Sequence, residues 1–249
     1  MVALIPVLIV IAVALIAGII LLAKLAKNVF KWVLIVGVVM LIVSIIFGVN
    51  VFNDFKSLQE NFPTAQKVFL LNDLGTIRAG FIQGSGEPDF TSIDSASLAD
   101  YRAKYKTESW DETPAGTFII LVDSAALSAA ADISFADAGI SAAQAMNIIK
   151  AQSSIDAALP ILITAQGVRD TPDTRALMKR QLTSNIGISS DQTMRNVLFA
   201  QLFGSSVQDS ASLITLYQSG SIKIYPDSSI FKLLRIIPSG ILKSVAGAG

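Results

Sequence analysis

The chain has 249 residues, of which 52% are hydrophobic and 15% are charged, and its formal net charge is zero. It contains no Cys and no His, which excludes disulfides, thiolate nucleophiles, Cys/His zinc sites and any catalytic arrangement that needs an imidazole. The balanced charge gives no reason to expect nucleic acid as a partner.

The apolar residues are concentrated near the N-terminus. The mean hydropathy of +0.60 is too high for an ordinary soluble protein. Residues 1–23 and 32–53 contain no charged side chain, and every Asp and Glu lies at position 54 or later. From Asp54 onward, 16 Lys and Arg residues face 19 Asp and Glu residues, on a segment long enough to bury its own core. The sequence therefore predicts a division of the chain near Asp54.

Two apolar runs before this division have the length of membrane-spanning helices. They cover residues 2–23 and 32–52, and at 1.5 Å per residue each reaches roughly 30 Å, the thickness of the hydrocarbon core of a bilayer. We predict a transmembrane helical hairpin at 1–53, with a basic loop at 24–31 between its two helices. No ionisable residue lies inside either run, which favours an anchor over a transport path.

Two alternatives to this hairpin remain open. A cleaved signal peptide would also explain the first run, and Ala12-Val13-Ala14 has the small-x-small pattern of a cleavage site. A buried helical hairpin of a soluble protein would explain both runs. We prefer the uncleaved anchor, because no basic segment precedes the first run and core helices rarely extend this far without a charge.

The loop between the two runs predicts the orientation. It carries Lys24, Lys27 and Lys31 and no acidic residue. Under the positive-inside rule this loop stays in the cytoplasm, which places both the N-terminus and the large domain outside. The sequence therefore predicts a two-pass cell-membrane protein with N-out/C-out topology and an extracytoplasmic domain.

Small residues recur within the two runs at the spacing that favours close helix packing in lipid. Ala14 and Gly18, and Ser44 and Gly48, are four residues apart, and Gly18 and Gly37 lie six residues from the two ends of the lysine loop, which predicts a similar depth for both glycines. We interpret these small residues as contacts between the two helices, the alternative being that glycine is simply common in membrane helices.

Behind the hairpin we predict a helical stalk at 54–66, an α+β domain at 67–227, and a C-terminal amphipathic segment with its tail at 228–249. The domain begins with strands at 67–72 and 76–82 around Asp73-Leu74-Gly75. This pattern predicts a β-hairpin in which Gly75 takes the positive φ of a tight turn.

The next predicted elements are a helix at 96–106 and a buried strand at 117–122. Ser141-Ala142-Ala143-Gln144 has the spacing of a capping box, which predicts a helix that runs to Ala158 and is stopped by Pro160. We expect a short buried strand at 161–165 to follow this proline.

Two more helices have clear start signals. Thr171-Pro172 predicts an N-cap followed by a first-turn proline, for a helix that ends near Gly187. Ser189-Ser190-Asp191-Gln192 predicts the start of another helix, which ends at Gly204. A second β-hairpin is then expected from strands at 213–218 and 221–225.

The predicted fold class is therefore a membrane α-helical hairpin of two transmembrane helices plus one α+β (mixed α/β) domain with two β-hairpins and about five helices. In the C-terminal segment, Lys232, Arg235 and Lys243 lie among apolar residues. This pattern predicts a basic amphipathic helix on lipid headgroups or, alternatively, a terminal helix packed on the domain core.

Without His or Cys, the catalytic options are carboxylate pairs, a Ser with a Lys base, or Tyr and Lys acting together. Residues 219–226, with the sequence Ser-Gly-Ser-Ile-Lys-Ile-Tyr-Pro, resemble the Ser-Gly-Ser-Met-x-Pro box of membrane signal peptidases. The resemblance implies a Ser/Lys dyad and a membrane-tethered hydrolase. The Met position holds Ile222 and the spacing to Pro differs, so we interpret this segment as a serine-rich turn.

A second resemblance concerns the first predicted hairpin. From Leu71 to Ile77 it has a Leu-x-x-x-Gly-x-Ile pattern, which resembles turns in the sheets of PAS-like and Cache-like sensors. This resemblance implies an extracytoplasmic ligand-sensing domain as an alternative function.

The leading hypothesis is a noncatalytic, membrane-anchored protein that presents an extracytoplasmic domain to a protein partner or to a second copy, or helps to assemble a membrane or envelope complex. Apart from such a partner, we expect the protein to interact only with the lipid bilayer. No catalytic, cofactor-binding or metal-binding residue is expected. A deep polar pocket would favour the sensor, a Ser beside a buried Lys the hydrolase, and exposed apolar surface the partner-binding protein.

Overall fold

In the computed structural model the chain divides into two compact units, residues 1–56 and 57–249. The structure describes residues 62, 64–84, 90–110, 113–114, 116–128, 130–207 and 210–237, all of them in the second unit. The two apolar runs, the lysine loop and most of the predicted stalk lie outside these residues.

The predicted fold class and localisation are corrected by the structure. Among the described residues, no helix is long and apolar enough to cross a membrane. The longest of them, α7 (Asp191–Ser206), has 16 residues, which is about 24 Å at 1.5 Å per residue and short of the roughly 30 Å of a hydrocarbon core. The fold that the structure gives is α+β, with seven α-helices in the described part and a mixed sheet. The described part therefore contains no spanning helix that would support the predicted two-pass, N-out/C-out topology.

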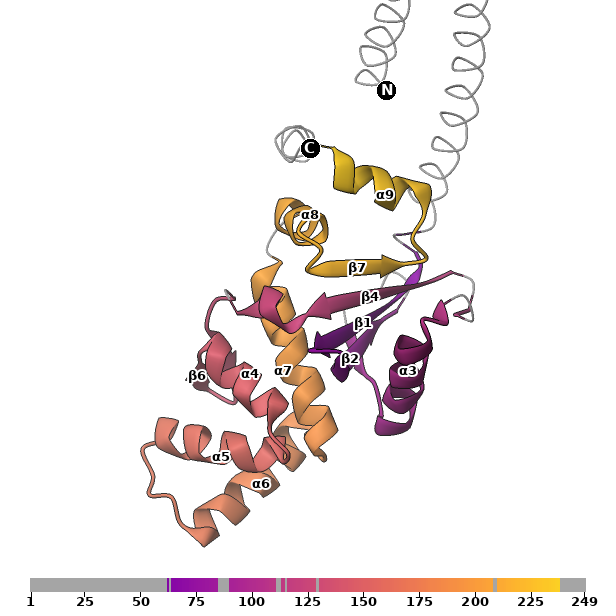
Figure 1. Cartoon of the computed structure of the whole chain (residues 1–249). Helices are drawn as coiled ribbons and strands as arrows, with labels where there is room; N and C mark the ends of the chain where they lie inside the picture. The colour runs from indigo at the N-terminus through magenta and orange to yellow at the C-terminus, as the bar shows by residue number, and fades with distance from the viewer. Residues whose placement is uncertain are drawn as a thin grey trace, which may run out of the picture. The chain divides into compact units, whose positions relative to one another are not determined.

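A five-stranded sheet forms the centre of the domain, with strand order β3-β2-β1-β4-β7 (Figure 1). Its strands, in chain order, are β1 (Gln66–Asp73), β2 (Thr76–Gln83), β3 (Phe90–Ser92), β4 (Thr117–Asp123) and β7 (Ile222–Tyr225). Only β1 and β4 run parallel; the other neighbours are antiparallel. The two central strands therefore end side by side at one edge of the sheet.

The first predicted hairpin is confirmed. Leu74 and Gly75 both have positive φ, at 48° and 86°, as a two-residue type I′ turn requires. The Gly75 amide donates to the Asn72 Oδ1, 3.1 Å away. The turn therefore fixes the register in which β2 returns along β1.

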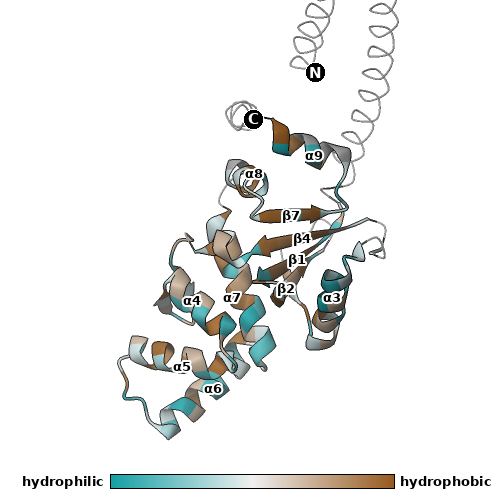
Figure 2. Cartoon of the chain, viewed as in Figure 1, coloured by the Kyte–Doolittle hydropathy of each residue, from teal (hydrophilic) through white to brown (hydrophobic). Residues whose placement is uncertain are grey.

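Apolar side chains alternate between the two faces of the sheet. On one face, Val68 and Leu70 pack under α3 (Ser95–Thr107), together with Trp110. On the other face, Phe69 and Leu71 belong to a larger core. Figure 2 shows the strands as strongly hydrophobic and much of α3 as hydrophilic, which matches a central sheet between two layers.

The larger core lies beneath a group of helices that begin in the middle of the chain. They are α4 (Ala142–Lys150), α5 (Ser154–Ala165), α6 (Pro172–Ile186) and α7 (Asp191–Ser206). A small hairpin of β5 (Ile133–Phe135) and β6 (Ala138–Ile140) and the 3-10 helix η2 (Ser124–Leu127) precede them. Stacked and tilted rings of Phe69, Phe81, Phe199 and Phe203 join α7 to the sheet.

Side chains of α7 complete the edge of β2 beyond the short strand β3. Asn196 is fully buried. Its Oδ1 accepts a hydrogen bond from the Gly80 amide at 3.0 Å, and its Nδ2 donates one to the Ile93 carbonyl at 2.7 Å. One turn earlier, Gln192 donates to the Arg78 carbonyl at 3.1 Å. Backbone groups that a longer neighbouring strand would satisfy are therefore satisfied by amide side chains.

Gly80 lies where this edge meets the core. A Cβ atom there would approach the Leu70 Cδ2 to 2.9 Å and the Phe69 carbonyl oxygen to 3.0 Å. We expect Gly80→Ala to lower the free energy of unfolding by about 1–3 kcal/mol, because backbone and core must shift to admit the methyl group. Urea denaturation monitored by tryptophan fluorescence measures this loss. Gly139→Ala, where the same added atom meets nothing within 4 Å, is the control.

Start signals were predicted better than the course of the helices. The Ser141/Gln144 capping box, the Thr171 cap with Pro172, and the αL C-cap at Gly187 are all confirmed. The helix predicted to run to Ala158 is wrong, since α4 ends at Lys150.

The helix that follows this break explains two of the errors. A new N-cap at Ser153 starts α5, which contains Pro160 in its interior. The strand predicted at 161–165 is therefore wrong. Burial of Ala158, Leu159, Leu162 and Ile163 has the spacing of one helix face, which outweighs the local effect of the proline.

The second predicted hairpin is also wrong. Its first strand is instead the helix α8 (Ser210–Gln218), in which Leu213, Leu216 and Tyr217 share one face toward the core. The segment predicted as its second strand is the strand β7, but it pairs with β4 and forms the edge of the five-stranded sheet opposite β3.

The predicted C-terminal segment begins with α9 (Ser229–Ile236), which packs on α8. Phe231 is buried against Tyr217, whose hydroxyl donates to the Phe231 carbonyl at 2.9 Å. The Gln218 side chain donates to the carbonyl oxygens of Leu234 and Ile237, near the helix end. The apolar face of α9 is therefore partly covered by the domain itself.

Candidate functional site

The carboxyl ends of β1 and β4 bring polar residues together at one edge of the sheet. Asn72 lies opposite Asp123 in the parallel register, directly after the apolar parts of both strands. Asp73 is the next residue after Asn72, and Ser124 is the next residue after Asp123. In sheets with parallel strands, sites commonly form outside these carboxyl ends. We call these four residues, together with the adjoining turn at Leu74 and Gly75, the strand-end rim.

Asp73 is the most buried charged group of the strand-end rim. Its side chain is 4% exposed, and Oδ1 accepts from the Lys150 Nζ at 2.8 Å and from the Ser124 Oγ at 2.9 Å. The Arg78 Nε lies 3.4 Å from Oδ2. Lys150 ends α4, and Arg78 follows the turn in β2, so one carboxylate ties the hairpin to a helix and to η2.

These partners set the ionisation of Asp73. Burial opposes the charged form and by itself raises the pKa of Asp73, but the hydrogen bonds from Lys150 and Ser124 and the charges of Lys150 and Arg78 together outweigh burial. The pKa of Asp73 therefore lies below its ordinary value of 3.8. Asp73 is therefore ionised at neutral pH.

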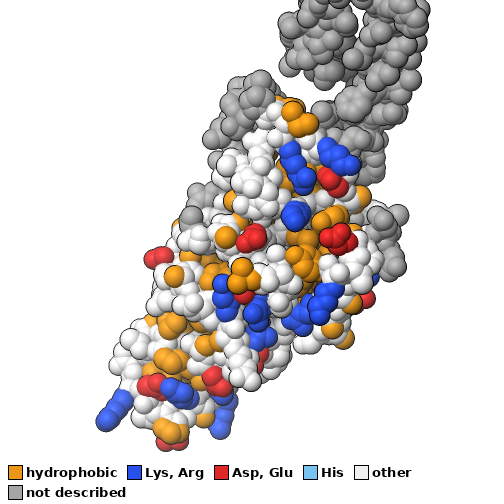
Figure 3. Space-filling model, viewed as in Figure 1, with side chains coloured by type: hydrophobic (Ala, Val, Ile, Leu, Met, Phe, Trp, Pro, Cys, Tyr) orange, Lys and Arg blue, Asp and Glu red, His pale blue; other side chains and the backbone are white. Residues whose placement is uncertain are grey.

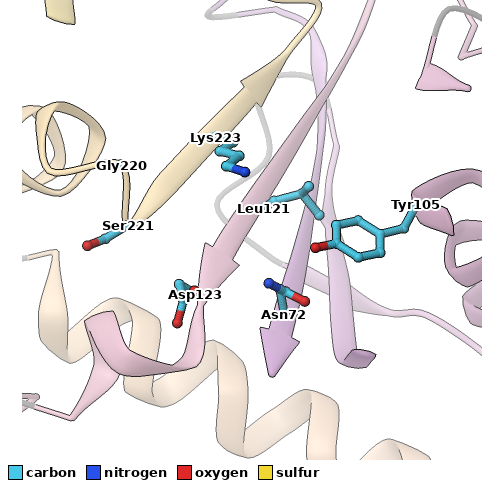
Figure 4. Close-up of a pocket in the computed structure, with 7 residues that line it drawn as sticks. All are labelled: Asn72, Tyr105, Leu121, Asp123, Gly220, Ser221 and Lys223. Carbon is cyan, nitrogen blue, oxygen red and sulfur yellow. The ribbon is translucent and has the colours of Figure 1, made fainter. Parts of the chain in front are cut away.

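A small pocket lies on the face of the sheet that α3 covers, between β1, β4, β7 and α3 (Figure 4). Its volume is about 40 Å³, and it is lined by Asn72, Tyr105, Leu121, Asp123, Gly220, Ser221 and Lys223. This volume has room for only a few water molecules. Two of its polar side chains already accept local hydrogen bonds: Asp123 Oδ1 from the Ala125 amide and Asn72 Oδ1 from the Gly75 amide.

A larger hollow of about 440 Å³ lies along α6, between Lys179, Arg180, Thr183 and Ser184. All four residues come from one helix, and the hollow is open to solvent. Lys179 pairs with Asp156 of α5 at 2.7 Å. Since no second element of the described part supplies polar groups to its lining, the described residues around it lack the convergent chemistry of a binding site.

Ser221 and Lys223 do not form the arrangement of a Ser/Lys dyad. The Ser221 Oγ accepts a hydrogen bond from the Ser219 Oγ at 2.8 Å. The Lys223 side chain is exposed, and Figure 4 shows it directed away from Ser221. A general-base lysine must be within hydrogen-bonding reach of its nucleophile, and these two side chains are not.

The acidic side chains of the described part are dispersed. No group of three Asp or Glu side chains comes together there in a way that could hold a metal ion.

Most residues singled out from the sequence fall outside the described part. Those residues are Lys24, Lys27, Lys31, Ala14, Gly18, Gly37, Ser44, Gly48 and Lys243. Lys232 and Arg235 lie on α9, and both are exposed. The Arg235 guanidinium lies 4.9 Å from the centroid of the Tyr217 ring, a cation–π distance.

Leu74, at the tip of the β1–β2 hairpin, was predicted only as part of a turn. Its side chain is 94% exposed, the largest value among the exposed apolar residues of the described part. Its φ of +48° is uncommon for a residue with a bulky side chain. The sequence carried a signal for it, since Asn or Asp usually occupies this position of a type I′ turn.

Comparison of the chain with protein-family models, characterised proteins and solved structures found no match. The strand-end rim, with its buried anion and its exposed apolar tip, is therefore the feature from which a function can be inferred.

Proposed function

We propose that the described domain is a noncatalytic protein-binding domain, and that the hairpin tip at Leu74 is the centre of its contact surface. The single observation that carries this proposal is Leu74, an exposed apolar side chain on a left-handed backbone. Either property alone is ordinary, but together they combine backbone strain with unburied apolar surface.

Leu74 has no role in folding that would account for its identity. A type I′ turn accepts Asn, Asp or Gly at this position with less strain than Leu, and a side chain that is 94% exposed contributes little to the core. An apolar side chain presented in this way is suited to insertion into a pocket of another protein.

The base of the hairpin is rigid, which favours binding without large rearrangement. Asp73, next to Leu74, is fixed by Lys150 and Ser124, and the tip itself is closed by the Asn72–Gly75 hydrogen bond. A backbone held in this way loses little conformational freedom when a partner covers the tip.

The two alternative functions receive less support. The pocket of about 40 Å³ is far below the roughly 300–1,000 Å³ of small-molecule sites, which weighs against ligand sensing. The separation of Ser221 from Lys223 weighs against a Ser/Lys hydrolase.

Photo-crosslinking tests the proposal directly. We expect a photoreactive amino acid at position 74 of the full-length chain, expressed in its native cells, to give a discrete crosslinked protein adduct. The control is the same amino acid at position 177. Leu177 is also an exposed apolar residue, 55% exposed, but lies on α6. Absence of an adduct at position 74, or the same adducts at both positions, would contradict the proposal.

A further inference from the structure

Three arginines from three different elements converge on the edge of β2 beside this hairpin. Arg78 is part of β2 itself. The Arg102 Nε of α3 donates to the Ile77 carbonyl at 2.7 Å, one residue before Arg78. Arg195 of α7 lies on the same side of its helix as Gln192, which donates to the Arg78 carbonyl.

Lys150 extends this group. It pairs with the same Asp73 carboxylate as Arg78, and Arg195 donates to the carbonyl oxygens of Ala151 and Gln152, directly after it. We call Arg78, Arg102, Lys150 and Arg195 the basic cluster. Figure 3 shows Lys and Arg side chains gathered on this face of the molecule, over α7 and α3.

The basic cluster has more cations than the acidic side chains of the described part neutralise. Within the described residues, Asp73 is the one acidic side chain that forms an ion pair with any of the four. Arg102 and Arg195 donate instead to backbone carbonyl groups, and the buried Arg195 Nε has no acceptor among the described residues. Burial lowers the pKa of Arg102, and the nearby positive charges of Arg195 and Arg78 lower it further.

We propose that the basic cluster binds an acidic segment of the protein partner, next to the pocket of that partner that receives Leu74. This inference rests on the proposed function. Guanidinium groups pair with carboxylates through two parallel hydrogen bonds, and complementary charge speeds association and sets orientation. The cations are spread over β2, α3, α4 and α7, so a chain with several carboxylates reaches them together, whereas a single small ion does not.

The exposure of the cluster agrees with this use. The side chains of Arg78 and Lys150 are 40% and 43% exposed, although the carboxylate that they share is buried. Both can therefore contact a second carboxylate without releasing Asp73. The structural ion pairs stay in place while the surplus positive charge is available to the partner.

A labelled acidic peptide provides the test. Fluorescein-labelled hexaglutamate, titrated with the full-length chain at low ionic strength, is expected to bind with an anisotropy change that is lost as salt is added. Arg102→Glu should weaken this binding by about tenfold, because it replaces attraction by repulsion near Arg78 and Arg195. Arg180→Glu, on the exposed side of α6, makes the same change of net charge and should leave binding unchanged.

Arg102→Gln keeps a donor for the Ile77 carbonyl and serves as the second variant if Arg102→Glu does not fold. It should weaken binding by about threefold. Equal effects of the substitutions at 102 and 180 would overturn the proposal, because binding would then follow net charge alone. Displacement of the peptide by an equal concentration of inorganic phosphate would also overturn it, in favour of a small-anion site.

Failure of the peptide-binding experiment can be distinguished from failure of the crosslinking experiment. An adduct at position 74 without peptide binding would support the proposed function and contradict the binding of an acidic segment. Peptide binding that depends on Arg102, without an adduct at position 74, would support the basic cluster and remove Leu74 as the contact.

Discussion

Replacement of Asn196 by Leu is expected to lower the free energy of unfolding by about 3–6 kcal/mol, because several buried polar groups lose their partners at once. Asn196 is completely buried on α7 and uses its whole side-chain amide. It accepts from Gly80 and Gln192 and donates to Ser92 and Ile93. Leu has a similar size but can make none of these hydrogen bonds.

The amide orientation is fixed by the backbone. The Gly80 amide can only donate and the Ile93 carbonyl can only accept, so the Asn196 oxygen must face Gly80 and its nitrogen Ile93. Asn196→Asp therefore places a carboxylate oxygen against a carbonyl oxygen in a buried position. We expect burial and this contact to raise the pKa of the new carboxyl group, so that the variant is least stable above that pKa.

The sign of the pH dependence follows from this shift. Below the raised pKa the carboxyl group carries a proton and can donate to the Ile93 carbonyl, so part of the lost stability returns as the pH falls. The measurement is urea denaturation of wild type, Asn196→Leu and Asn196→Asp between about pH 4 and 8. Asn185→Leu, an exposed asparagine near the end of α6, is the control. Equal urea midpoints for wild type and Asn196→Leu would show that the β2 edge does not depend on this amide.

The role of Asn196 also shows where prediction from sequence stops. Local signals were sufficient for the β1–β2 hairpin, for α3 and for the caps of α4 and α6, because the residues that define them are neighbours in the chain. The contacts of Asn196 with Gly80 and Ile93 span more than a hundred residues. Within a helix pattern, a buried asparagine cannot be told from an exposed one until the neighbouring strand is known.

The same reason accounts for the errors in α5 and α8. Pro160 was taken as a stop signal, but a cap at Ser153 moves it into the interior of a helix whose buried face outweighs the missing amide. Residues 213–218 contain apolar and β-branched residues in a run too short to distinguish a strand from a helix. Their packing against the core decides in favour of α8.

The candidate site was less predictable than the fold. Asp73 was identified only as a turn residue, because its partners Arg78, Ser124 and Lys150 come from three other elements. The convergence of Arg102 and Arg195 depends on α3 and α7 meeting the same strand edge. Only Leu74 carried a signal readable from sequence, as a bulky apolar residue before the glycine of a hairpin turn.

Asp73→Asn is expected to lower the free energy of unfolding at neutral pH by about 2–3 kcal/mol. This is less than the roughly 3–5 kcal/mol for breaking a fully buried ion pair, because Arg78 and Lys150 remain partly in contact with water. The amide keeps an acceptor for the Ser124 hydroxyl but removes the negative charge that both cations share.

The pH dependence distinguishes loss of this charge from a general disturbance. Since the pKa of Asp73 is lowered in the folded protein, its stabilising effect is present above the unfolded-state value near 3.8 and disappears as the pH falls through the folded-state pKa. The difference in free energy of unfolding between wild type and Asp73→Asn should therefore be largest above about pH 5 and shrink toward pH 2. Urea titrations at fixed pH values measure it.

The matched control is Asp170→Asn. Asp170 forms a two-point ion pair with Arg175, at 2.7 and 2.8 Å, and its pKa is also lowered, first through the hydrogen bond from Arg175. This pair is exposed, so solvent screens it, and its removal should have a much smaller effect than that of Asp73. If the two variants differ equally from wild type, or if the effect of Asp73→Asn is the same at about pH 3 and pH 7, Asp73 does not act as the buried anion that connects the hairpin to α4.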